Sequence, residues 1–318
     1  MKIVVLDGFA LNPGDMSWDN MKQLGDLVVY ERTPVDKVVE RIGSAEIILT
    51  NKVVLTREIL QKAPSVKYIG VTATGYNVVD TNAAKELGII VTNVPAYSTA
   101  SVAQLVFAFI LELCHHVGDH NNTVQEGGWT KSPDFTFWNY PLIELVGKTL
   151  GIIGFGAIGQ ATARIATAFG MKVLFYNRTK RLELETDKIK FAELEQVLGL
   201  SDFISLHCPL TKQTEGLINK VSIAKMKTGA FLINTSRGPV LDEQDVADAL
   251  NSGKLAGAAV DVVSIEPIKE DNPLLGVKNC IITPHFAWAP LEARTRLMDT
   301  LVKNIRAFLE NKPINVVN

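Results

Sequence analysis

The sequence predicts an α/β protein of two domains, each built on a parallel β-sheet with helices on both faces. In both halves of the chain, short apolar runs rich in valine and isoleucine alternate with amphipathic stretches, as strands buried in a parallel sheet do. The alternation stops once, at a long apolar helix pattern and an irregular polar stretch, and then restarts. At 318 residues the chain is too long for one compact α/β unit and long enough for two.

The first hundred residues contain the first set of candidate strands. The amphipathic stretches between them include residues 35–42 and 56–63, whose apolar positions recur at helical spacing. Strands separated by helices favour parallel pairing, because a parallel connection needs a crossover. The candidate strands are residues 2–6, 27–30, 46–50, 68–71 and 89–91.

A long helix follows this first set. Residues 98–113 are apolar and of high helix propensity, and Ser98 or Thr99 is placed to serve as the N-cap. Residues 120–141 are polar and rich in aromatic side chains, with no clear periodicity. The sequence therefore predicts one long helix and then an irregular segment between the two α/β units.

The second set of strands shows a stronger pattern than the first. A last helix, residues 290–311, ends before a proline and has no sheet of its own. We infer that it returns to pack on the first unit. The candidate strands of the second set are residues 149–155, 172–176, 203–206, 230–234, 257–262 and 280–283.

This return makes the first domain discontinuous. We expect one domain from residues 1–98 together with 287–318, and another from residues 99–286. The cleft between two such units is the natural place for a ligand.

Composition excludes several classes of protein. A net charge of −2 gives no footprint for nucleic acid or for an anionic membrane surface. The apolar run at residues 105–111 is far shorter than a membrane span. Asp7 interrupts the first apolar run after four residues, which suits a buried strand and not a signal peptide. We expect neither a nucleic acid nor a membrane as a partner.

The three cysteines, Cys114, Cys208 and Cys280, show neither paired spacing nor a metal-binding pattern. Isolated thiols are typical of a reduced, cytoplasmic protein. The sequence therefore predicts a cytoplasmic location, no disulfide and no metal site.

A glycine-rich turn opens the second unit. Gly154, Gly156 and Gly159 follow a strand and begin a helix in the spacing G-x-G-x-x-G. The first glycine permits a tight turn, the second lets the backbone approach a pyrophosphate, and the third lets the helix lie close to the strand. The helix N-terminus would then face the anion. The alternative is a purely structural glycine-rich turn.

The first unit lacks such a fingerprint. After its fourth strand, the stretch 70–80 places small residues, Thr74 and Gly75 in a turn. Backbone N–H groups there could cradle a carboxylate. An ordinary left-handed turn at Gly75 is an equally good interpretation.

Polar residues follow three strands of the second unit. Arg237 follows the strand at 230–234, Asp261 and Glu266 follow the next, and His285 follows the last. Ligands of open α/β sheets bind outside the carboxyl ends of the strands, so these side chains should converge. Arginine can hold a carboxylate by two hydrogen bonds, and histidine can transfer a proton while a neighbouring carboxylate orients it.

Each of these residues has a structural alternative. Arg237 could form a surface ion pair, Glu266 could cap a loop, and His285 could be a satisfied strand-end histidine. The shared position of the three residues favours a functional site. His207 follows a strand and is expected to line a cofactor. The remaining histidines lie at or beyond a helix end and are expected to be structural or exposed: His115, His116 and His120.

At this point the sequence resembles the D-isomer-specific 2-hydroxyacid dehydrogenase family over its whole length. The motifs that carry the resemblance are NVPAYSTASVAQ, GIIGFGAIG, SLHCPLT, INTSRGPVLDE, DV-x3-EP and TPHFAW. The resemblance implies a flavodoxin-like substrate domain formed by both chain ends and a Rossmann cofactor domain. It also implies a homodimer formed mainly through the cofactor domain.

The resemblance assigns roles to the polar residues. Arg237 would bind the 2-oxo acid, His285 would be the general acid/base, and Glu266 its partner. Asp261 and the backbone of residues 235–237 would contact the nicotinamide. The implied cofactor-binding residues are Gly154, Gly156, Ala157, Ile158, Gly159, Asn177, Arg178, Thr179, His207, Cys208, Pro209, Thr214, Thr235, Ser236 and Asp261.

Within the family, the stretch around Trp288 resembles the glycerate dehydrogenase or hydroxypyruvate (glyoxylate) reductase branch. Lys52, Thr74, Gly75, Arg237 and Trp288 are the expected substrate-binding residues. A D-lactate-type dehydrogenase and a cofactor-sensing binding module of the same fold are the alternatives. Trp138 lies in another stretch that resembles this branch, and such a residue could either reach a partner's active site or lie in the core of a dimer interface.

The turn after the strand at 172–176 bears on the choice of cofactor. NAD-specific proteins carry an acidic residue at this strand end. In this sequence Asn177 stands there instead, followed by Arg178 and Thr179. Asparagine removes the charge that repels a 2′-phosphate, and arginine and threonine can donate to one, with Lys180 or Arg181 adding positive potential. The sequence predicts NADP(H) in preference to NAD(H); a solvated basic turn that accepts NAD(H) is the alternative.

Overall fold

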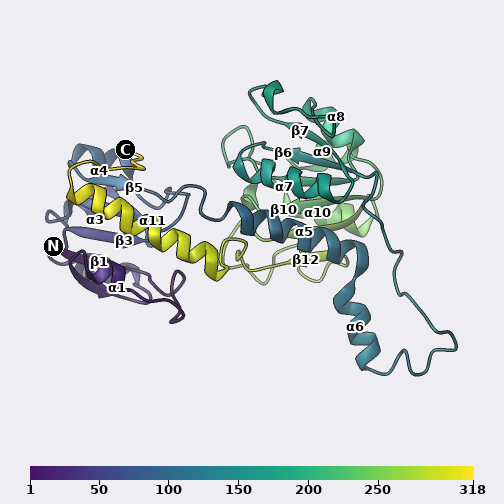
Figure 1. The fold of residues 1–318 in the computed structure, drawn as a ribbon, viewed down its shortest axis with the longest axis horizontal. Coiled ribbons are helices and arrows are strands. Elements are labelled where there is room, and N and C mark those ends of the chain that lie inside the picture. Colours follow the sequence, from purple (N-terminus) through teal and green to yellow (C-terminus); the bar gives the residue numbers. More distant parts are fainter. The chain divides into compact units, whose positions relative to one another are not determined.

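The computed structural model describes all residues from Met1 to Asn318, and the chain divides into two units that we describe separately (Figure 1). Unit 1 contains Met1–Ser98 and Ala289–Asn318, and unit 2 contains Thr99–Trp288. The return to unit 1 thus follows Trp288, where the sequence placed it after residue 286. The predicted class, α/β with two parallel sheets flanked by helices, is confirmed.

Unit 1 is built on a five-stranded sheet in the order β2-β1-β3-β4-β5, in which every pair of neighbours is parallel. This is the flavodoxin-like strand order, with its switch point between β1 and β3. Strands β3 and β4 are buried along their whole length, which explains their continuous apolar sequence. The strands are β1 (Lys2–Val5), β2 (Asp26–Val29), β3 (Ile47–Thr50), β4 (Tyr68–Val71) and β5 (Ile90–Thr92).

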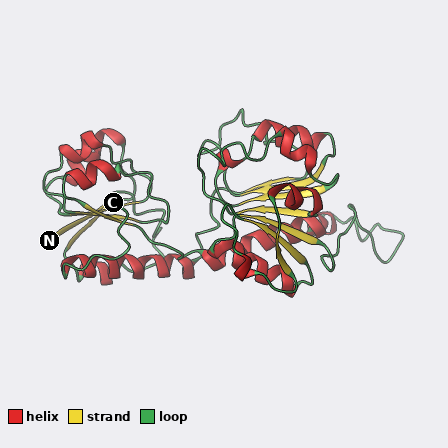
Figure 2. Cartoon of the chain, turned by 90° about the horizontal axis from the view of Figure 1, so that it is seen from above, coloured by secondary structure: helices red, strands yellow, loops and turns green.

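Helices cover both faces of this sheet (Figure 2). The long C-terminal helix α11 (Leu291–Leu309) packs on β4 and buries Leu297, Leu301 and Ile305, as the sequence predicted for a helix without a sheet of its own. In the first part of the chain, Thr56 caps α3 (Arg57–Gln61) and Asp80 caps α4 (Thr81–Glu86) through their side chains. The other helices of unit 1 are α1 (Asp19–Lys22), α2 (Val38–Ile42), α3 (Arg57–Gln61) and α4 (Thr81–Glu86), with a 3₁₀ turn, η1 (Val35–Lys37).

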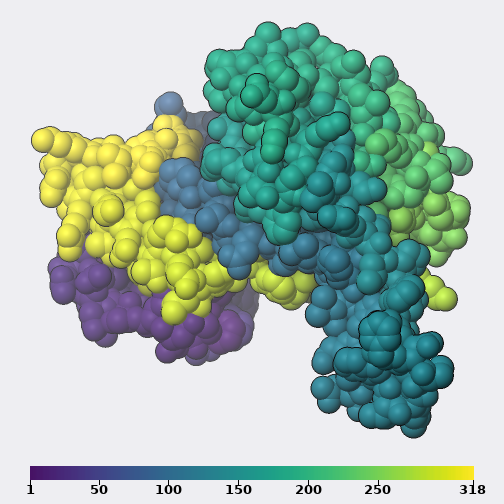
Figure 3. All heavy atoms as spheres, turned by 45° about the vertical axis from the view of Figure 1, so that its right-hand side comes forward, coloured from purple at the N-terminus to yellow at the C-terminus, as the bar shows by residue number.

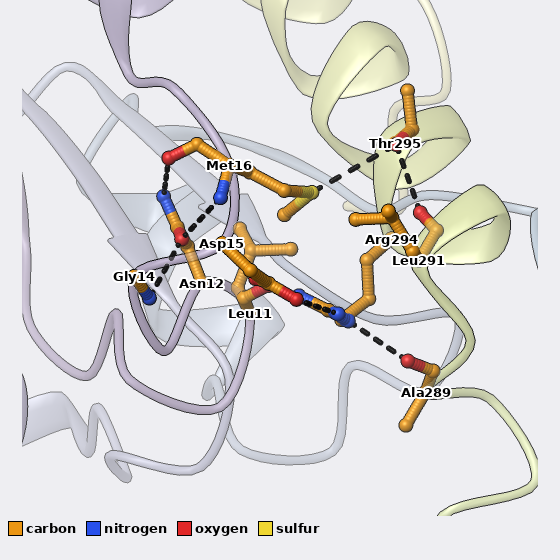
Figure 4. A network of polar contacts seen from close by, with 9 residues as sticks. All are labelled: Leu11, Asn12, Gly14, Asp15, Met16, Ala289, Leu291, Arg294 and Thr295. Atoms are coloured by element: carbon orange, nitrogen blue, oxygen red, sulfur yellow. Dashed lines mark hydrogen bonds and ion pairs between the residues drawn. The ribbon is translucent and has the colours of Figure 1, made fainter.

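A buried arginine joins the two chain ends within unit 1 (Figure 4). Arg294, only 7% exposed, donates from both terminal nitrogens to the carboxylate of Asp15, at 2.7 and 2.6 Å. Its other donors reach the carbonyl oxygens of Leu11 and Ala289. The hydrogen bond from Arg294 lowers the pKa of Asp15. This network fixes the segment after β1 to the start of α11.

Unit 2 is built on a seven-stranded sheet in the order β12-β11-β10-β9-β6-β7-β8, again entirely parallel. Its first six strands along the chain have the Rossmann order, with the switch point between β6 and β9. The sequence did not predict β8, a three-residue strand at the sheet edge. The strands are β6 (Thr149–Ile153), β7 (Lys172–Tyr176), β8 (Ile189–Phe191), β9 (Phe203–Leu206), β10 (Ala230–Asn234), β11 (Leu255–Val260) and β12 (Cys280–Ile282).

Helices lie on both faces of the second sheet as well (Figure 2). Helix α7 opens with the glycine-rich turn, as the sequence predicted, and Asp242 caps α10 through its side chain. The helices of unit 2 are α5 (Thr99–His115), α6 (Val117–Gln125), α7 (Ala157–Ala168), α8 (Leu194–Leu200), α9 (Lys220–Lys225) and α10 (Glu243–Asn251), with 3₁₀ turns η2 (Leu182–Leu184) and η3 (Gly238–Val240).

Helix α6 and the segment after it, residues 126–142, project from the rest of unit 2 (Figures 1 and 3). The sequence predicted no helix here, because α6 buries none of its residues and so has no apolar stripe. No single helix is long and apolar enough to cross a membrane; α5 and α6 reach that length only together, with a 54° bend between them.

Candidate active site

The three predicted catalytic residues follow three adjacent strands of unit 2. Arg237 lies just after β10, Glu266 after β11 and His285 after β12, and these strands are neighbours in the sheet. Because the strands are parallel, their carboxyl ends lie at one edge of the sheet. The expected convergence of a cation, a carboxylate and an imidazole at this edge is therefore built into the topology.

Glu266 and His285 form a direct pair. The Nδ1 atom of His285 lies 2.7 Å from Oε2 of Glu266, and their side chains are 28% and 34% exposed. His285 has a positive φ of 52°, which is uncommon for a residue with a side chain. The pair thus lies at the protein surface on a tightly turned backbone, with Nε2 of the imidazole not used in this contact.

A buried carboxylate holds the turn that carries His285. Asp261, 1% exposed, accepts from the hydroxyl of Thr283 at 2.6 Å and from the backbone N–H groups of Phe286 and Ala287 at 3.0 and 2.9 Å. Burial raises the pKa of Asp261, and these hydrogen bonds oppose the rise. The sequence pointed to Asp261 as a nicotinamide contact; its carboxylate is already occupied in fixing the histidine turn.

The turn that carries Arg237 depends on a buried asparagine. Asn234, at the end of β10, donates to the carbonyl oxygen of Arg237 and accepts from the N–H and hydroxyl of Ser236. Arg237 is exposed, and Nη1 donates to the carbonyl oxygen of Ser236 at 2.6 Å. A guanidinium has five N–H donors, so the side chain keeps donors for a carboxylate ligand.

The glycine-rich turn has the properties expected of a phosphate loop. Gly154 has a φ of +97°, and a Cβ there would lie 2.5 Å from the backbone nitrogen of Cys208. A Cβ on Gly159 would lie 2.4 Å from the carbonyl oxygen of Gly154, whereas one on Gly156 would meet no protein atom within 4 Å. Two glycines are therefore required by packing, and the middle one leaves open space at the N-terminus of α7.

These residues fit a dinucleotide. Gly156 is the N-cap of α7 and provides no side-chain hydrogen bond to the helix, so no side chain competes with an anion. The hydroxyl of Thr235, in the loop after β10, is buried and has no hydrogen-bond partner within the protein. A buried orphaned hydroxyl beside the carboxyl ends of the strands is a position where a ligand can supply the missing partner.

The turn after β7 separates its basic residues into two groups. Lys180 lies 2.6 Å from Glu193, and Arg181 forms an ion pair with Glu183, so both positive charges are matched. Arg178 is exposed and forms no ion pair. The positive potential that the sequence assigned to the whole turn is therefore concentrated on Arg178.

Asn177 connects this turn to the phosphate loop. Its Oδ1 atom accepts from the backbone N–H of Phe155 at 3.4 Å, and its Nδ2 atom donates to the carbonyl oxygen of Thr179 at 3.3 Å. Both contacts are long, so the amide remains available to a ribose hydroxyl.

The loop after β9 lies against the phosphate loop, since the Cβ of an alanine at Gly154 would clash with the backbone of His207 and Cys208. The imidazole of His207 contacts the hydroxyl of Ser205 at 2.9 Å, and burial lowers the pKa of His207 to about 4. Such an imidazole is neutral at pH 7 and does not act as a proton donor there. Thr214 closes the following turn by donating to the carbonyl oxygen of Pro209 at 2.6 Å.

Unit 1 carries three of the predicted substrate-binding residues, on loops that follow its central strands. Lys52 is exposed after β3, and Thr74 and Gly75 follow β4. The hydroxyl of Thr74 donates to the carbonyl oxygen of Val94 at 2.8 Å. Trp288, half-buried, is the last residue of unit 2.

The sequence missed a carboxylate that holds the loop of Lys52. Asp7, just after β1, accepts from the backbone N–H groups of Asn51, Lys52 and Val53 at 2.8, 2.6 and 3.1 Å. The side chain of Asn51 in turn donates to the carbonyl oxygen of Thr72 at 2.9 Å. Asp7 is separated from this loop by more than forty residues of sequence, so no local pattern reveals the contact.

Among the histidines predicted to be structural, two have aromatic partners in unit 2. The ring of His116 stacks on that of Tyr140 at 4.2 Å, and the ring of His120 meets Tyr140 edge-on at 6.0 Å. His115, at the end of α5, is exposed. None of these side chains joins the catalytic pair.

Comparison with known proteins identifies the family. A family model described as "D-isomer specific 2-hydroxyacid dehydrogenase, NAD binding domain" matches residues 107–287, which is nearly all of unit 2. The chain therefore belongs to the D-isomer-specific 2-hydroxyacid dehydrogenase family, as its motifs predicted, and it is an oxidoreductase with a nicotinamide-binding domain.

Relatives narrow the branch. The chain is 58% identical over 321 aligned positions to the hydroxypyruvate reductase of Blautia hydrogenotrophica, covering 100% of both chains. It is 42% identical to the glycerate dehydrogenase of Methylorubrum extorquens, over 91% of this chain and 90% of the relative. A solved structure of an acyclic imino acid reductase in complex with NADPH and D-Arg has a TM-score of 0.88 at 33% identity, covering 100% of both chains. The predicted glycerate and hydroxypyruvate branch is confirmed.

Proposed function

We propose that this protein reduces hydroxypyruvate, and the smaller 2-oxo acid glyoxylate, to the D-2-hydroxy acid at the expense of a reduced nicotinamide cofactor. The observation that carries the proposal is the 2.7 Å contact between His285 and Glu266, beside the strand end that bears Arg237. The relatives named hydroxypyruvate reductase and glycerate dehydrogenase support this choice of substrate.

The proton comes from His285. A carboxylate only accepts hydrogen bonds, so Nδ1 of the imidazole donates to Glu266 and Nε2 is left to exchange a proton with the substrate oxygen. Asp261 keeps the histidine turn in place through three hydrogen bonds. When bound, the reduced nicotinamide supplies the hydride to the keto carbon.

Arg237 binds the substrate carboxylate. Its exposed guanidinium offers paired N–H donors in the geometry that a carboxylate accepts, and its positive charge stabilises the alkoxide that develops in the transition state. Lys52, Thr74, Gly75 and Trp288 complete the proposed substrate-binding set. Asp7 supports this set by holding the backbone on either side of Lys52.

The proposed cofactor is NADP(H) in preference to NAD(H). Asn177 places no negative charge at the end of β7, and Arg178 is the one cation of the turn without a carboxylate partner. The complex of the related imino acid reductase with NADPH supports a fold of this kind accepting the phosphorylated cofactor. Gly156, Thr235 and Ser236, with the N-terminus of α7, would hold the pyrophosphate and nicotinamide half.

Exchanging the two turn residues tests this preference. Asn177→Asp with Arg178→Ile restores an acid and removes the cation, so we expect the ratio of kcat/KM for NADPH to that for NADH to fall about a hundredfold, since each charge-assisted contact is worth about 1.5–3 kcal/mol. Lys180→Ile is the matched control, because that lysine is already paired with Glu193. A wild-type enzyme whose kcat/KM for NADH equals or exceeds that for NADPH would contradict the proposal.

We further propose a homodimer formed through unit 2. The projecting segment exposes Phe135 at 88% and Trp138 at 63%, with Trp129 and Leu142 about half exposed. Aromatic side chains gathered on one segment are typical of an interface. Sedimentation equilibrium of the wild type and of Phe135→Glu tests this, with dimer for the first and a weakened dimer for the second as the expected result.

Steady-state assays test the activity itself. Oxidation of reduced cofactor is followed with hydroxypyruvate, glyoxylate and pyruvate, and we expect the highest kcat/KM with hydroxypyruvate. A preference for pyruvate would favour a D-lactate-type dehydrogenase. Tight cofactor binding without turnover of any 2-oxo acid would favour a cofactor-sensing binding module.

A further inference from the structure

One buried acid of unit 2 has no part in the proposed chemistry. Glu243 is the first residue of α10 and is only 8% exposed. Burying a carboxylate is unfavourable unless donors compensate it. Its partners therefore identify what it does.

All the partners of Glu243 belong to the loop that carries Glu266. Oε1 accepts from the backbone N–H of Ser264 at 2.7 Å, and Oε2 accepts from the hydroxyl of Ser264 at 2.7 Å and from Nδ2 of Asn272 at 2.9 Å. These contacts lie on either side of Glu266 along the chain. One carboxylate thus holds both ends of the segment 264–272.

A glycine makes a second contact with the same loop. A Cβ on Gly238, the residue after Arg237, would lie 2.0 Å from the carbonyl carbon of Val263 and 2.4 Å from the nitrogen of Ser264. Only glycine allows the two backbones to meet this closely. The turn of Arg237 and the loop of Glu266 are therefore packed backbone to backbone, and Glu243 ties the same loop to the start of α10.

The backbone next to the part of the loop that Glu243 holds is hydrogen-bonded to Glu266 of the proposed catalytic pair. The N–H of Val263, next to the fastened residues, donates to Oε1 of Glu266 at 3.4 Å, while Oε2 of Glu266 meets His285 at 2.7 Å. On this basis, and resting on the proposed function, we propose that Glu243 is a positioning residue that, with Gly238, fixes the loop so that Glu266 meets His285.

The test is Glu243→Gln in the full-length protein. An amide has one acceptor oxygen and brings its own NH₂ donor, so it cannot satisfy the three donors that the carboxylate accepts. We expect kcat for hydroxypyruvate to fall about tenfold to a hundredfold, the range for misplacement of a reacting group. The dissociation constant of the reduced cofactor should not change.

Asp242→Asn is the matched control. Asp242 caps the same helix by accepting from the N–H of Asp245 and has no side-chain contact with residues 263–272. It therefore reports any general effect of disturbing α10. Thermal unfolding of both variants shows whether each is folded.

A double-mutant cycle separates positioning from general destabilisation. If Glu243 acts through Glu266, the loss caused by Glu243→Gln disappears in a Glu266→Gln background, and the pH profile of kcat/KM for Glu243→Gln shifts towards that of Glu266→Gln. Losses that multiply, or a loss equal to that of Asp242→Asn, would overturn the proposal.

Hydrogen exchange tests the positioning role of Glu243 separately from the proposed catalytic function. Unchanged turnover in Glu266→Gln would show that Glu266 takes no part in the reaction, so that the loop would have no catalytic role to support. Amide exchange in residues 263–272 still decides whether Glu243 fastens the loop: faster exchange in Glu243→Gln than in Asp242→Asn supports it, and equal exchange contradicts it.

Discussion

The two sheets of this chain share a parallel layout but treat their switch points in opposite ways. In unit 1 the loops after β1 and β3 are joined by Asp7, which accepts three backbone N–H groups of residues 51–53. In unit 2 the loops after β6 and β9 are joined by close backbone contact, which the glycine at 154 permits. One junction uses a charge and consumes N–H donors; the other uses neither.

This difference explains which sheet binds the dinucleotide. A phosphate needs free N–H donors and no negative charge beside them. Asp7 fills that position in unit 1, whereas in unit 2 the N-terminus of α7 has no side-chain cap and Gly156 leaves open space. The match of the NAD-binding family model to residues 107–287 agrees with this division. The same strand order therefore serves two purposes, depending on a few residues in the loops.

The largest expected effect comes from removing the acid/base group of unit 2. His285→Ala should lower kcat about a hundredfold to ten-thousandfold, the usual contribution of general acid–base catalysis, while cofactor binding is retained. Arg237→Ala should cause a comparable loss. His115→Ala, an exposed histidine of the same unit, is the control. Near-normal turnover in a folded His285→Ala protein would show that His285 is not the acid/base group and would contradict the catalytic site proposed for unit 2.

Filling the switch point of unit 2 should separate binding from stability. A Cβ added at Gly156 would have no protein atom within 4 Å, so we expect Gly156→Val to lower the thermal midpoint only slightly, through the poorer N-cap that valine makes. The dissociation constant of the cofactor should rise about a hundredfold, equivalent to about 2.7 kcal/mol. Calorimetric titration with reduced cofactor measures this. Unchanged affinity would mean that the dinucleotide does not approach α7.

Loosening the loops at the switch point of unit 1 should weaken substrate binding and leave cofactor binding unchanged. Asp7→Asn leaves some backbone N–H groups of residues 51–53 without an acceptor. We expect KM for hydroxypyruvate to rise up to about tenfold, because the loop of Lys52 would lose a hydrogen bond worth about 0.5–1.5 kcal/mol. Cofactor affinity should not change. Asp80→Asn, which keeps a competent cap on α4, is the control, and a loss of cofactor binding in Asp7→Asn would break the comparison.

The smallest expected effect is a decrease in the free energy of unfolding at acidic pH, caused by a buried histidine of unit 2. The folded pKa of His207 is lowered to about 4 from an ordinary value of 6.5, so between these values the unfolded chain takes up a proton that the folded chain does not. The free energy of unfolding should therefore fall as the pH drops from 6.5 towards 4. His207→Asn should flatten this fall, as measured by thermal midpoints across the window; an unchanged slope would contradict the assignment.

The sequence predicted what depends on local pattern. Buried strands such as β4 and β10 read as continuous apolar runs, and the turn at Gly154 carries its own fingerprint. Helix α6 was missed because it buries nothing, and β8 because an exposed lysine, Lys190, interrupts its short apolar run. Each lacks the periodicity on which such predictions depend.

The site was predictable only in part, for a related reason. Arg237, Glu266 and His285 stand out because each follows a predicted strand. Asp7 and Glu243 do not stand out, because each contacts a loop that lies 44 or 21 residues away in sequence. A carboxylate bound to distant backbone N–H groups leaves no signal in its sequence neighbours, so these two residues emerge only from the fold.

The central claim is that unit 2 presents a reductase site for small 2-oxo acids with a preference for the phosphorylated cofactor. The most direct test is the kcat/KM of the wild-type protein for NADPH and for NADH with hydroxypyruvate as the substrate. We predict rapid oxidation of NADPH and slower oxidation of NADH. Oxidation of NADH as fast as that of NADPH would contradict the preference, and no oxidation of either cofactor with hydroxypyruvate, glyoxylate or pyruvate would contradict the reductase site itself.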